Sequence, residues 1–256
     1  MNPFRKATRF AADSVDIYLF WLTSALREAA PRAHGQMLDV GCGDRRFEHL
    51  FEPFVDSYTG VEHETVFASL DASKRATGPQ VLYDGKRLPF EAQSFDTVVS
   101  TEVLEHTPDP AALVAEMVRV LRPGGTLILT APLTFRLHEE PYDYFRFTPH
   151  GLASLLERVG MHVIDTRSFG SVFSVVGHKL NSYLAFRVAH LQGVGRFLGK
   201  MSHEGSAHGD RLRVWTLPLV LPTMMGVAGA AHLLDRFLHD PTESLGYLVV
   251  AEHARS

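Results

Sequence analysis

The chain has 256 residues, of which 45% are apolar and 21% are charged, and its formal net charge is −4. This balance is typical of a globular core, and the net negative charge argues against nucleic-acid binding, which needs a basic surface. The single cysteine, Cys42, excludes an intramolecular disulfide and favours a reducing compartment, so we expect a cytoplasmic protein.

The first predicted element is an amphipathic helix over residues 13–30, which covers one edge of a sheet and stops at Pro31. Basic residues precede its apolar run, as they do in a signal peptide. However, Asp13 and Asp16 interrupt that pattern, and no small-residue cleavage site follows. We therefore predict no secretion signal.

A strand over 37–41 then leads into a glycine turn within MLDVGCGDRRF, with a helix over 45–52 behind it. Gly41 and Gly43 permit a tight turn, which would present the N-terminus of that helix to a nucleotide-like ligand. A dinucleotide fingerprint needs a third glycine at position 46, where this chain has Arg46. The turn thus favours a nucleotide-like cofactor but argues against an NAD-linked oxidoreductase.

Strands and helices continue to alternate along the chain, as in a doubly wound α/β fold. The second strand ends at the acidic Glu62, where a carboxylate can accept both hydroxyls of a ribose. The helix before LRPGG is predicted to end at Arg122, since Pro123 cannot continue it. Further strands are expected over 57–62, 80–83, 95–100, 124–131, 161–168 and 246–252, and further helices over 65–74 and 109–121.

Two downstream strings, YDGKRLPFEAQSFDTVVSTEVLEH and LRPGGTLILTAP, together with the glycine turn, closely resemble class I S-adenosylmethionine-dependent methyltransferases that act on small molecules. The resemblance is strong from Met37 to Pro132, weaker to Asp165, and returns at GYLVVAEH, Gly246 to His253. It implies a Rossmann-like, seven-stranded doubly wound sheet whose last strand pairs antiparallel at the edge.

The resemblance also implies S-adenosylmethionine as the cofactor and assigns its contacts to matching positions. The residues toward the methionine part are Asp39, Gly41, Cys42 and Gly43, and Glu62 holds the ribose. Asp84 with Gly85 meets the adenine amino group, and Leu88 and His63 flank the adenine ring. Glu102 lies beside the cofactor. For Cys42 itself we expect packing rather than chemistry.

Arg45 departs from the family, which usually has a glycine two residues after Gly43. Its side chain would either crowd the cofactor or turn outward. We predict the outward position, because a βα turn can pass a long side chain to solvent where the backbone does not need a positive φ.

Candidate catalytic residues follow the fourth and fifth strands, at the edge where open α/β sheets bind ligands. His106 or His138 would remove the proton of a hydroxyl acceptor, since an imidazole titrates near neutral pH. In the string HEEPYDYFRFT, which is familiar from a subset of the family, Tyr142 and Tyr144 would orient the acceptor, and Arg146 would suit a carboxylate or phosphate.

Structural roles for the same residues stay open. His106 would alternatively hydrogen-bond the chain near Asp109, and Asp143 with Arg146 would form an ion pair that pins a lid. His203 and His208 lie in a segment that we read as a solvated loop. Their spacing matches no helix-borne metal pair and the cofactor chemistry needs no metal, so we predict no metal site.

A long insertion separates the sixth strand from the last, so the predicted parts are a core over 1–168, a helical insertion over 169–244 and a final core strand over 245–256. Residues 166–213 hold seven Lys or Arg and two acidic residues, a charge of +5, so the remaining chain carries −9. Residues 214–234 hold no Asp, Glu, Lys or Arg, and this segment is long enough to cross a bilayer. Two features argue against crossing: Pro218 and Pro222 interrupt the segment, and the chain must return to the sheet for its last strand.

Four readings of the insertion stay open. It forms a peripheral contact with anionic membrane, a roof over the active site, a homodimer contact, or a hairpin through the bilayer. The sequence as a whole predicts methyl transfer to a small or lipid-linked acceptor, at a hydroxyl oxygen, in the cytoplasm or at the inner face of a membrane. The alternatives are C-methylation of a quinone-like precursor, methylation of a sugar, and a non-catalytic binding module with a methyltransferase fold.

Overall fold

The computed structural model describes residues 16–70, 72–76, 78–189, 214–238, 240 and 242–254. The chain divides into two compact units. The first takes Met1–Leu22, Thr134–Pro141 and Ser168–Leu245, and the second takes Thr23–Leu133, Tyr142–Arg167 and Gly246–Ser256. His203 and His208 lie outside the described residues, as does the start of the predicted first helix.

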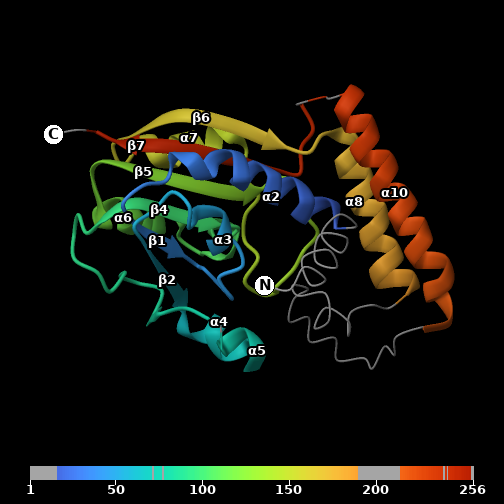
Figure 1. The fold of residues 1–256 in the computed structure, drawn as a ribbon, viewed down its shortest axis with the longest axis horizontal. Helices are drawn as coiled ribbons and strands as arrows, with labels where there is room; N and C mark the ends of the chain where they lie inside the picture. Colours follow the sequence, from blue (N-terminus) through green and yellow to red (C-terminus); the bar gives the residue numbers. More distant parts are fainter. Residues whose placement is uncertain are drawn as a thin grey trace. The chain divides into compact units, whose positions relative to one another are not determined.

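The second unit is built on one seven-stranded sheet (Figure 1) with the order β3-β2-β1-β4-β5-β7-β6. Neighbouring strands from β3 to β5 run parallel, and β7 runs antiparallel to β5. The predicted doubly wound fold with an antiparallel last strand is therefore confirmed. The strands are β1 (Gln36–Val40), β2 (Ser57–His63), β3 (Val81–Tyr83), β4 (Phe95–Thr101), β5 (Leu121–Pro132), β6 (Met161–Phe169) and β7 (Gly246–His253).

The position predicted for the last strand is wrong. β7 does not lie at the edge but between β5 and β6, and β6 forms the edge. Its sequence agrees with an interior strand, because residues 248–251 of β7 are apolar and fully buried, as in a strand covered on both faces.

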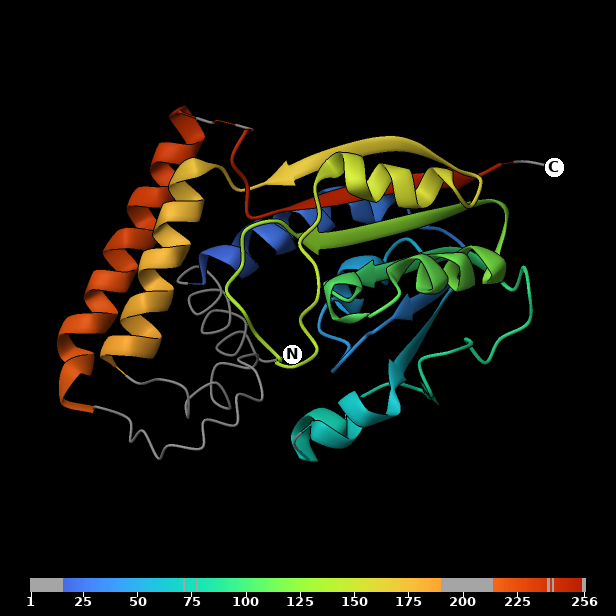
Figure 2. The same ribbon diagram turned by 180° about the vertical axis from the view of Figure 1, so that it is seen from behind.

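Helices cover both faces of the sheet. Figure 2 shows α6 and α7 on one face, with α3 and the second half of α2 on the other. Within the described residues the helical elements of this part are α2 (Ile17–Ala29), η1 (Ala30–Arg32), α3 (Glu48–Phe51), α4 (Glu64–Ser69), α5 (Ala72–Ala76), η2 (Leu104–His106), α6 (Pro110–Val120) and α7 (Pro149–Glu157).

Three predicted boundaries differ from the structure. α3 starts only at Glu48 because Arg45 has a φ of +59°, which a right-handed helix cannot contain. The predicted helix over 65–74 is divided at Leu70, whose backbone is extended. The strand β5 already begins at Leu121, since Pro123 keeps Arg122 out of the helical region.

Glu116 and Arg119 on α6 hold the segment that follows β3. The Glu116 carboxylate accepts from the Leu88 N–H at 3.0 Å and from the Arg119 guanidinium at 2.8 Å. Arg119 also donates to the carbonyls of Leu88 and Phe90, at 3.0 and 2.9 Å. The pair thus satisfies backbone groups of a loop that forms no strand or helix of its own.

Replacing Glu116 with glutamine should lower the free energy of unfolding at pH 7 by roughly 1–3 kcal/mol, the range for hydrogen bonds to charged groups. The hydrogen bonds from Arg119 lower the pKa of Glu116 below its ordinary value of 4.5. The ionised Glu116 therefore stabilises the folded protein fully above its unfolded-state pKa of 4.5. This stabilisation is lost as the pH falls through the lower pKa of the folded state. Urea unfolding of both proteins from pH 7 to pH 3 checks this, and a difference that stays constant with pH would contradict it.

The first unit contains a pair of helices, α8 (Val172–Tyr183) and α10 (Leu217–Phe237), which lie side by side in both views. The π-helical turn η3 (Leu184–Val188) continues α8, and the turn η5 (Val214–Thr216) precedes α10. Asp235, which is 3% exposed, accepts hydrogen bonds from the Ser171 and Ser174 hydroxyls. Asn181 donates to the Met224 carbonyl at 3.1 Å. These contacts fix the two helices in an antiparallel register.

Candidate cofactor and acceptor site

The predicted cofactor residues gather at one edge of the sheet because they follow parallel neighbouring strands. Asp39 lies in β1 opposite Gly60 of β2, and Glu62 lies in β2 opposite Leu82 of β3. The carboxyl ends of parallel strands meet at the same edge, which is where open α/β sheets bind ligands. The order β3-β2-β1-β4 therefore places the glycine turn after β1 between the ends of β2 and β4.

Glu62 is held in place by backbone groups on both sides. It is 6% exposed, and its Oε2 accepts from the Gly43 N–H at 2.7 Å while its Oε1 accepts from the His63 N–H at 2.8 Å. An ionised carboxylate offers about four acceptor positions, so this arrangement keeps acceptor capacity for other donors. A ribose diol is such a pair of donors, and Glu62 fits the role that the resemblance implies.

A second buried carboxylate, Asp39, lies beside the same turn. It is 6% exposed and accepts from the Tyr58 hydroxyl at 2.5 Å. Burial, together with the charge of Asp39, raises the pKa of Tyr58, so the phenol stays a donor. Burial and then the charges of Asp39 and Glu62 raise the pKa of the Cys42 thiol, which argues against a nucleophilic role. Concentrated negative charge of this kind suits a cationic ligand such as a sulfonium with an ammonium group.

The two glycines of the turn have different surroundings. Both have a positive φ, +75° at Gly41 and +55° at Gly43. A Cβ on Gly41 would lie 2.3 Å from Cγ2 of Val103, whereas a Cβ on Gly43 would meet no atom within 4 Å. Gly41 is therefore required by packing, while Gly43 borders open space of the kind that a cofactor's methionine part needs.

Alanine at these two glycines should separate folding from binding. Gly41→Ala combines a positive φ with a steric clash and should lower the free energy of unfolding by roughly 2–4 kcal/mol. Gly43→Ala carries only the backbone strain, about 1 kcal/mol, but should weaken S-adenosylhomocysteine binding at least about tenfold. Urea unfolding and calorimetry on both variants check this. Unchanged binding by Gly43→Ala would argue that the cofactor does not pass over this glycine.

The prediction for the Arg45 backbone is wrong. Arg45 has a φ of +59°, so the position does need the left-handed region, where a glycine carries no Cβ penalty. Its side chain is 25% exposed, lies over the Tyr58 ring with the guanidinium carbon 5.2 Å from the centroid, and pairs with Glu48. These two contacts hold the guanidinium against the protein rather than in solvent.

The residues assigned to the adenine lie at the ends of β2 and β3. His63 ends β2 and caps α4, where its Nδ1 accepts from the Thr65 N–H, and its ring lies against Gly85. Burial, with the charges of Glu62 and Asp84, raises the pKa of Tyr83 to about 12. Asp84 is exposed and its Oδ1 accepts from the Lys86 N–H at 3.0 Å.

Leu88, by contrast, is 1% exposed and belongs to the hydrophobic core under this edge. Its side chain packs in that core in this structure, and its contact with the adenine ring stays a prediction. The roles of Glu62, His63 and Asp84 toward the cofactor are likewise predictions, which their shared position supports.

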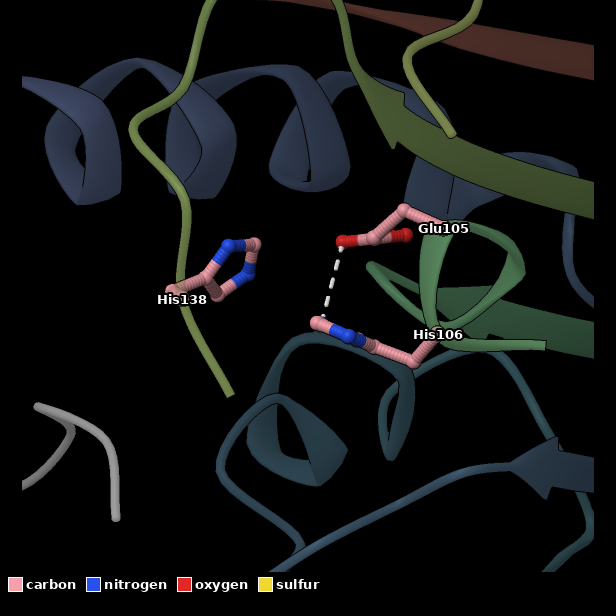
Figure 3. A group of neighbouring side chains, drawn as sticks. All are labelled: Glu105, His106 and His138. Atoms are coloured by element: carbon pink, nitrogen blue, oxygen red, sulfur yellow. Dashed lines mark ion pairs between the residues drawn. The ribbon is translucent and has the colours of Figure 1, made fainter. Parts of the chain in front are cut away.

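The end of β4 carries the candidate base. Glu102 has a φ of +55°, a strained conformation of the kind found at functional sites, and its N–H donates to Thr130. His106 follows in η2, with Nδ1 2.7 Å from the Tyr142 carbonyl oxygen. Its Nε2 lies 3.6 Å from Oε1 of Glu105. Figure 3 shows the two side chains, with a dashed line that marks this contact. Glu105 is fully buried.

The segment after β5 is anchored to the same turn. The N–H groups of Tyr144 and Phe145 donate to the Glu105 carbonyl at 2.8 and 3.3 Å. Arg146 forms a bidentate pair with the buried Asp143, at 2.6 and 2.9 Å, which matches the structural alternative stated for this pair. Tyr144 remains 44% exposed.

His138 does not belong to this unit. It lies in the other unit, with its ring 4.7 Å from that of Phe135 and its Nδ1 3.2 Å from the Arg136 carbonyl oxygen. Of the four predicted catalytic residues, the second unit thus brings together His106, Tyr144 and Arg146.

Sequence reasoning gave no role to Tyr58, the hydrogen-bond donor to Asp39, or to the carboxylate of Glu105 beside His106. Tyr58 falls in a predicted strand, where an aromatic residue indicates only packing. Its register opposite Met37 brings it near Asp39, and one sequence carries no signal for that register.

Comparison with known proteins agrees with this geometry. Residues 38–129 match the family model described as a methyltransferase domain. An uncharacterized methyltransferase of Mycobacterium marinum is 36% identical over 180 residues, which span 68% of this chain and 69% of that protein. A relative from Mycobacterium avium with the same description is 40% identical over 132 residues, 50% of this chain and 51% of its own.

Solved structures show the same fold at low identity. An S-adenosylmethionine-dependent methyltransferase from Mesorhizobium loti superposes with a TM-score of 0.51 at 18% identity, over 90% of this chain and 96% of that one. The [4+2]-cyclase SpnF superposes with a TM-score of 0.55 at 21% identity, over 92% and 80%. The fold therefore does not decide the activity by itself. The match to the mycobacterial methyltransferases shows the family. The chain belongs to the class I S-adenosylmethionine-dependent methyltransferases.

Proposed function

We propose that the protein transfers a methyl group from S-adenosylmethionine to a hydroxyl oxygen of a small or lipid-linked acceptor, with His106 as the general base. The cofactor would supply a methyl group on a sulfonium, which already carries a good leaving group. The protein's task is then to hold donor and acceptor in line, exclude water and accept one proton.

The position of His106 carries this proposal. A carbonyl oxygen only accepts, so the 2.7 Å contact with Tyr142 means that Nδ1 carries the proton of the neutral ring. That tautomer leaves Nε2 as the basic nitrogen. The carboxylate of Glu105, which is buried, lies 3.6 Å from Nε2, beside the nitrogen that would take the proton. In the proposed step the new C–O bond forms as the S–C bond breaks, and the hydroxyl proton goes to Nε2.

Two observations support the cofactor part. Asp39 and Glu62 are both buried carboxylates at the edge of the sheet, and Gly43 faces open space. A cationic, diol-bearing ligand would complement these two carboxylates with an opposite charge and two hydroxyl donors. This favours a working methyltransferase over a binding module that has kept only the fold.

C-methylation of a quinone-like precursor is the second candidate, because such a carbon acceptor also loses a proton to a base. The test is methyl transfer from isotopically labelled S-adenosylmethionine to a panel of phenols, sugars, lipid-linked sugars and quinone precursors. Products are then examined by NMR for a methoxy or a C-methyl signal. We expect methoxy products that His106→Asn fails to form. C-methyl products alone would overturn the choice of oxygen.

A further inference from the structure

The outward face of the α8–α10 pair is apolar to an extent unusual for a helix in water. Large side chains along η5 and α10 are mostly exposed: Trp215 (78%) in η5, and Leu219 (76%), Met225 (61%), Leu233 (59%) and Phe237 (73%) in α10. Val176, Leu180 and Tyr183 add exposed apolar surface on α8. The buried residues of α10, such as Ala228 and Ala231, lie on its other side toward α8.

The exposed apolar side chains form one continuous face because of their spacing along the helix. Positions 219, 233 and 237 recur at intervals that return to one side of α10, so their side chains form a stripe rather than scattered points. Contiguous apolar surface of this kind marks a contact site on a monomer.

The exposed charges on the helical elements themselves have one sign. Among the described residues of α8, η3, η5 and α10, the exposed charged side chains are Lys179, Arg187 and Arg236. The single acidic residue in these elements, Asp235, is buried against Ser171 and Ser174. The whole chain is nevertheless net negative, at −4. Positive charge beside an apolar face complements an anionic lipid surface.

We propose that this face docks the enzyme onto anionic membrane by entering the headgroup region of one leaflet. Tryptophan and tyrosine suit that region because their rings are apolar and their polar atoms can meet headgroups. Lys179, Arg187 and Arg236 would contact lipid phosphates. The inference goes beyond methyl transfer and does not depend on which acceptor atom is methylated.

The structure argues for docking rather than crossing. α10 has 21 residues and is long and apolar enough to span a membrane. However, the helical pair leaves the sheet after β6 and returns to it at β7, so one crossing would separate β7 from its neighbours. Among the described residues of the insertion, a second crossing would have to use α8 and η3, which have 12 and 5 residues and carry Lys179 and Arg187. Lipid-buried charges of this kind are costly.

Flotation of the full-length protein tests the proposal. The vesicles are equal parts phosphatidylglycerol and phosphatidylcholine, or phosphatidylcholine alone. We expect flotation on the anionic vesicles, release at about 1 M NaCl, where the Debye length is ~3 Å, and weak flotation on neutral vesicles. The emission of Trp215 should shift to the blue on binding, measured in a Trp21→Phe background because the chain has two tryptophans.

A matched pair of variants identifies the face. Leu219→Glu with Phe237→Glu should weaken binding by roughly 100-fold, since withdrawing each large apolar side chain costs about a factor of ten. Phe54→Glu with Val66→Glu adds the same charge at exposed apolar positions of the other unit, which are 42% and 40% exposed. This variant should bind the vesicles more tightly than Leu219→Glu with Phe237→Glu does. Circular dichroism of both variants confirms that each is folded.

Four results would overturn the proposal. They are no flotation of the wild type, equal losses in the two double variants, resistance to alkaline carbonate extraction, and a stable dimer that Leu219→Glu with Phe237→Glu dissociates. The third would identify a spanning helix, and the fourth a contact between two copies of the chain. Methyl-transfer assays with a water-soluble acceptor, run without vesicles, distinguish all of these from failure of the proposed enzymatic function.

Discussion

Replacing His106 with asparagine should lower kcat for methyl transfer by about 10²–10⁴-fold, the usual contribution of a general base. The Asn amide can still donate to the Tyr142 carbonyl, as Nδ1 does at 2.7 Å in the structure, but it offers no basic nitrogen. The loss should therefore fall on kcat, while KM for the cofactor and the thermal midpoint of unfolding change little. Steady-state kinetics and thermal unfolding provide the measurement.

A purely structural role predicts different behaviour. If His106 only anchors the segment after β5, His106→Asn would keep its activity because the amide preserves the anchor, and His106→Gly would lose stability and activity together. Under our proposal, added imidazole should restore part of the activity to His106→Gly, because it supplies the missing base. Absence of rescue together with an active His106→Asn would remove His106 from the chemistry.

Replacing Glu62 with alanine should weaken S-adenosylhomocysteine binding by about 10²–10⁴-fold in calorimetry. Two hydrogen bonds from ribose hydroxyls to a carboxylate contribute about 1.5–3 kcal/mol each, and 1.4 kcal/mol is a factor of ten in affinity. The substitution also releases the Gly43 and His63 N–H groups that Glu62 accepts at 2.7 and 2.8 Å, so the glycine turn loses a support. Both effects act in the same direction on binding.

Glu64→Ala is the matched control, because Glu64 is an exposed carboxylate two residues along the chain. It should leave the affinity within about twofold, as surface substitutions have small effects. Equal affinities of Glu62→Ala and the wild type would contradict the ribose assignment. Failure of the wild type itself to bind would contradict the cofactor.

The sequence predicts the sheet well because its strands are short apolar runs bounded by glycine and proline. Every predicted strand is present, with ends that differ by at most one residue except at the start of β5. The place of β7 was missed because strand order depends on long-range pairing, here between residues such as Thr126 and Glu252. No local pattern encodes that pairing.

The sequence names candidate site residues, whose roles stay predictions, but it does not give their geometry. Glu62 was chosen because it ends the second predicted strand, and Asp39 because the resemblance places it toward the cofactor. The positive φ at Arg45 was missed because a residue type does not reveal its own backbone conformation when glycine is absent. The tautomer of His106 depends on a carbonyl 36 residues away, which only the fold brings to Nδ1.

The interior place of β7 also bears on how the protein is made. β7 follows the helical pair in the chain, yet it fills the space between β5 and β6. On the ribosome, the nascent chain therefore presents the unpaired edges of both strands until the helical pair has been synthesised. Translation that stops inside the insertion would leave an open, aggregation-prone sheet. The sheet can be completed only after the helical pair has been made.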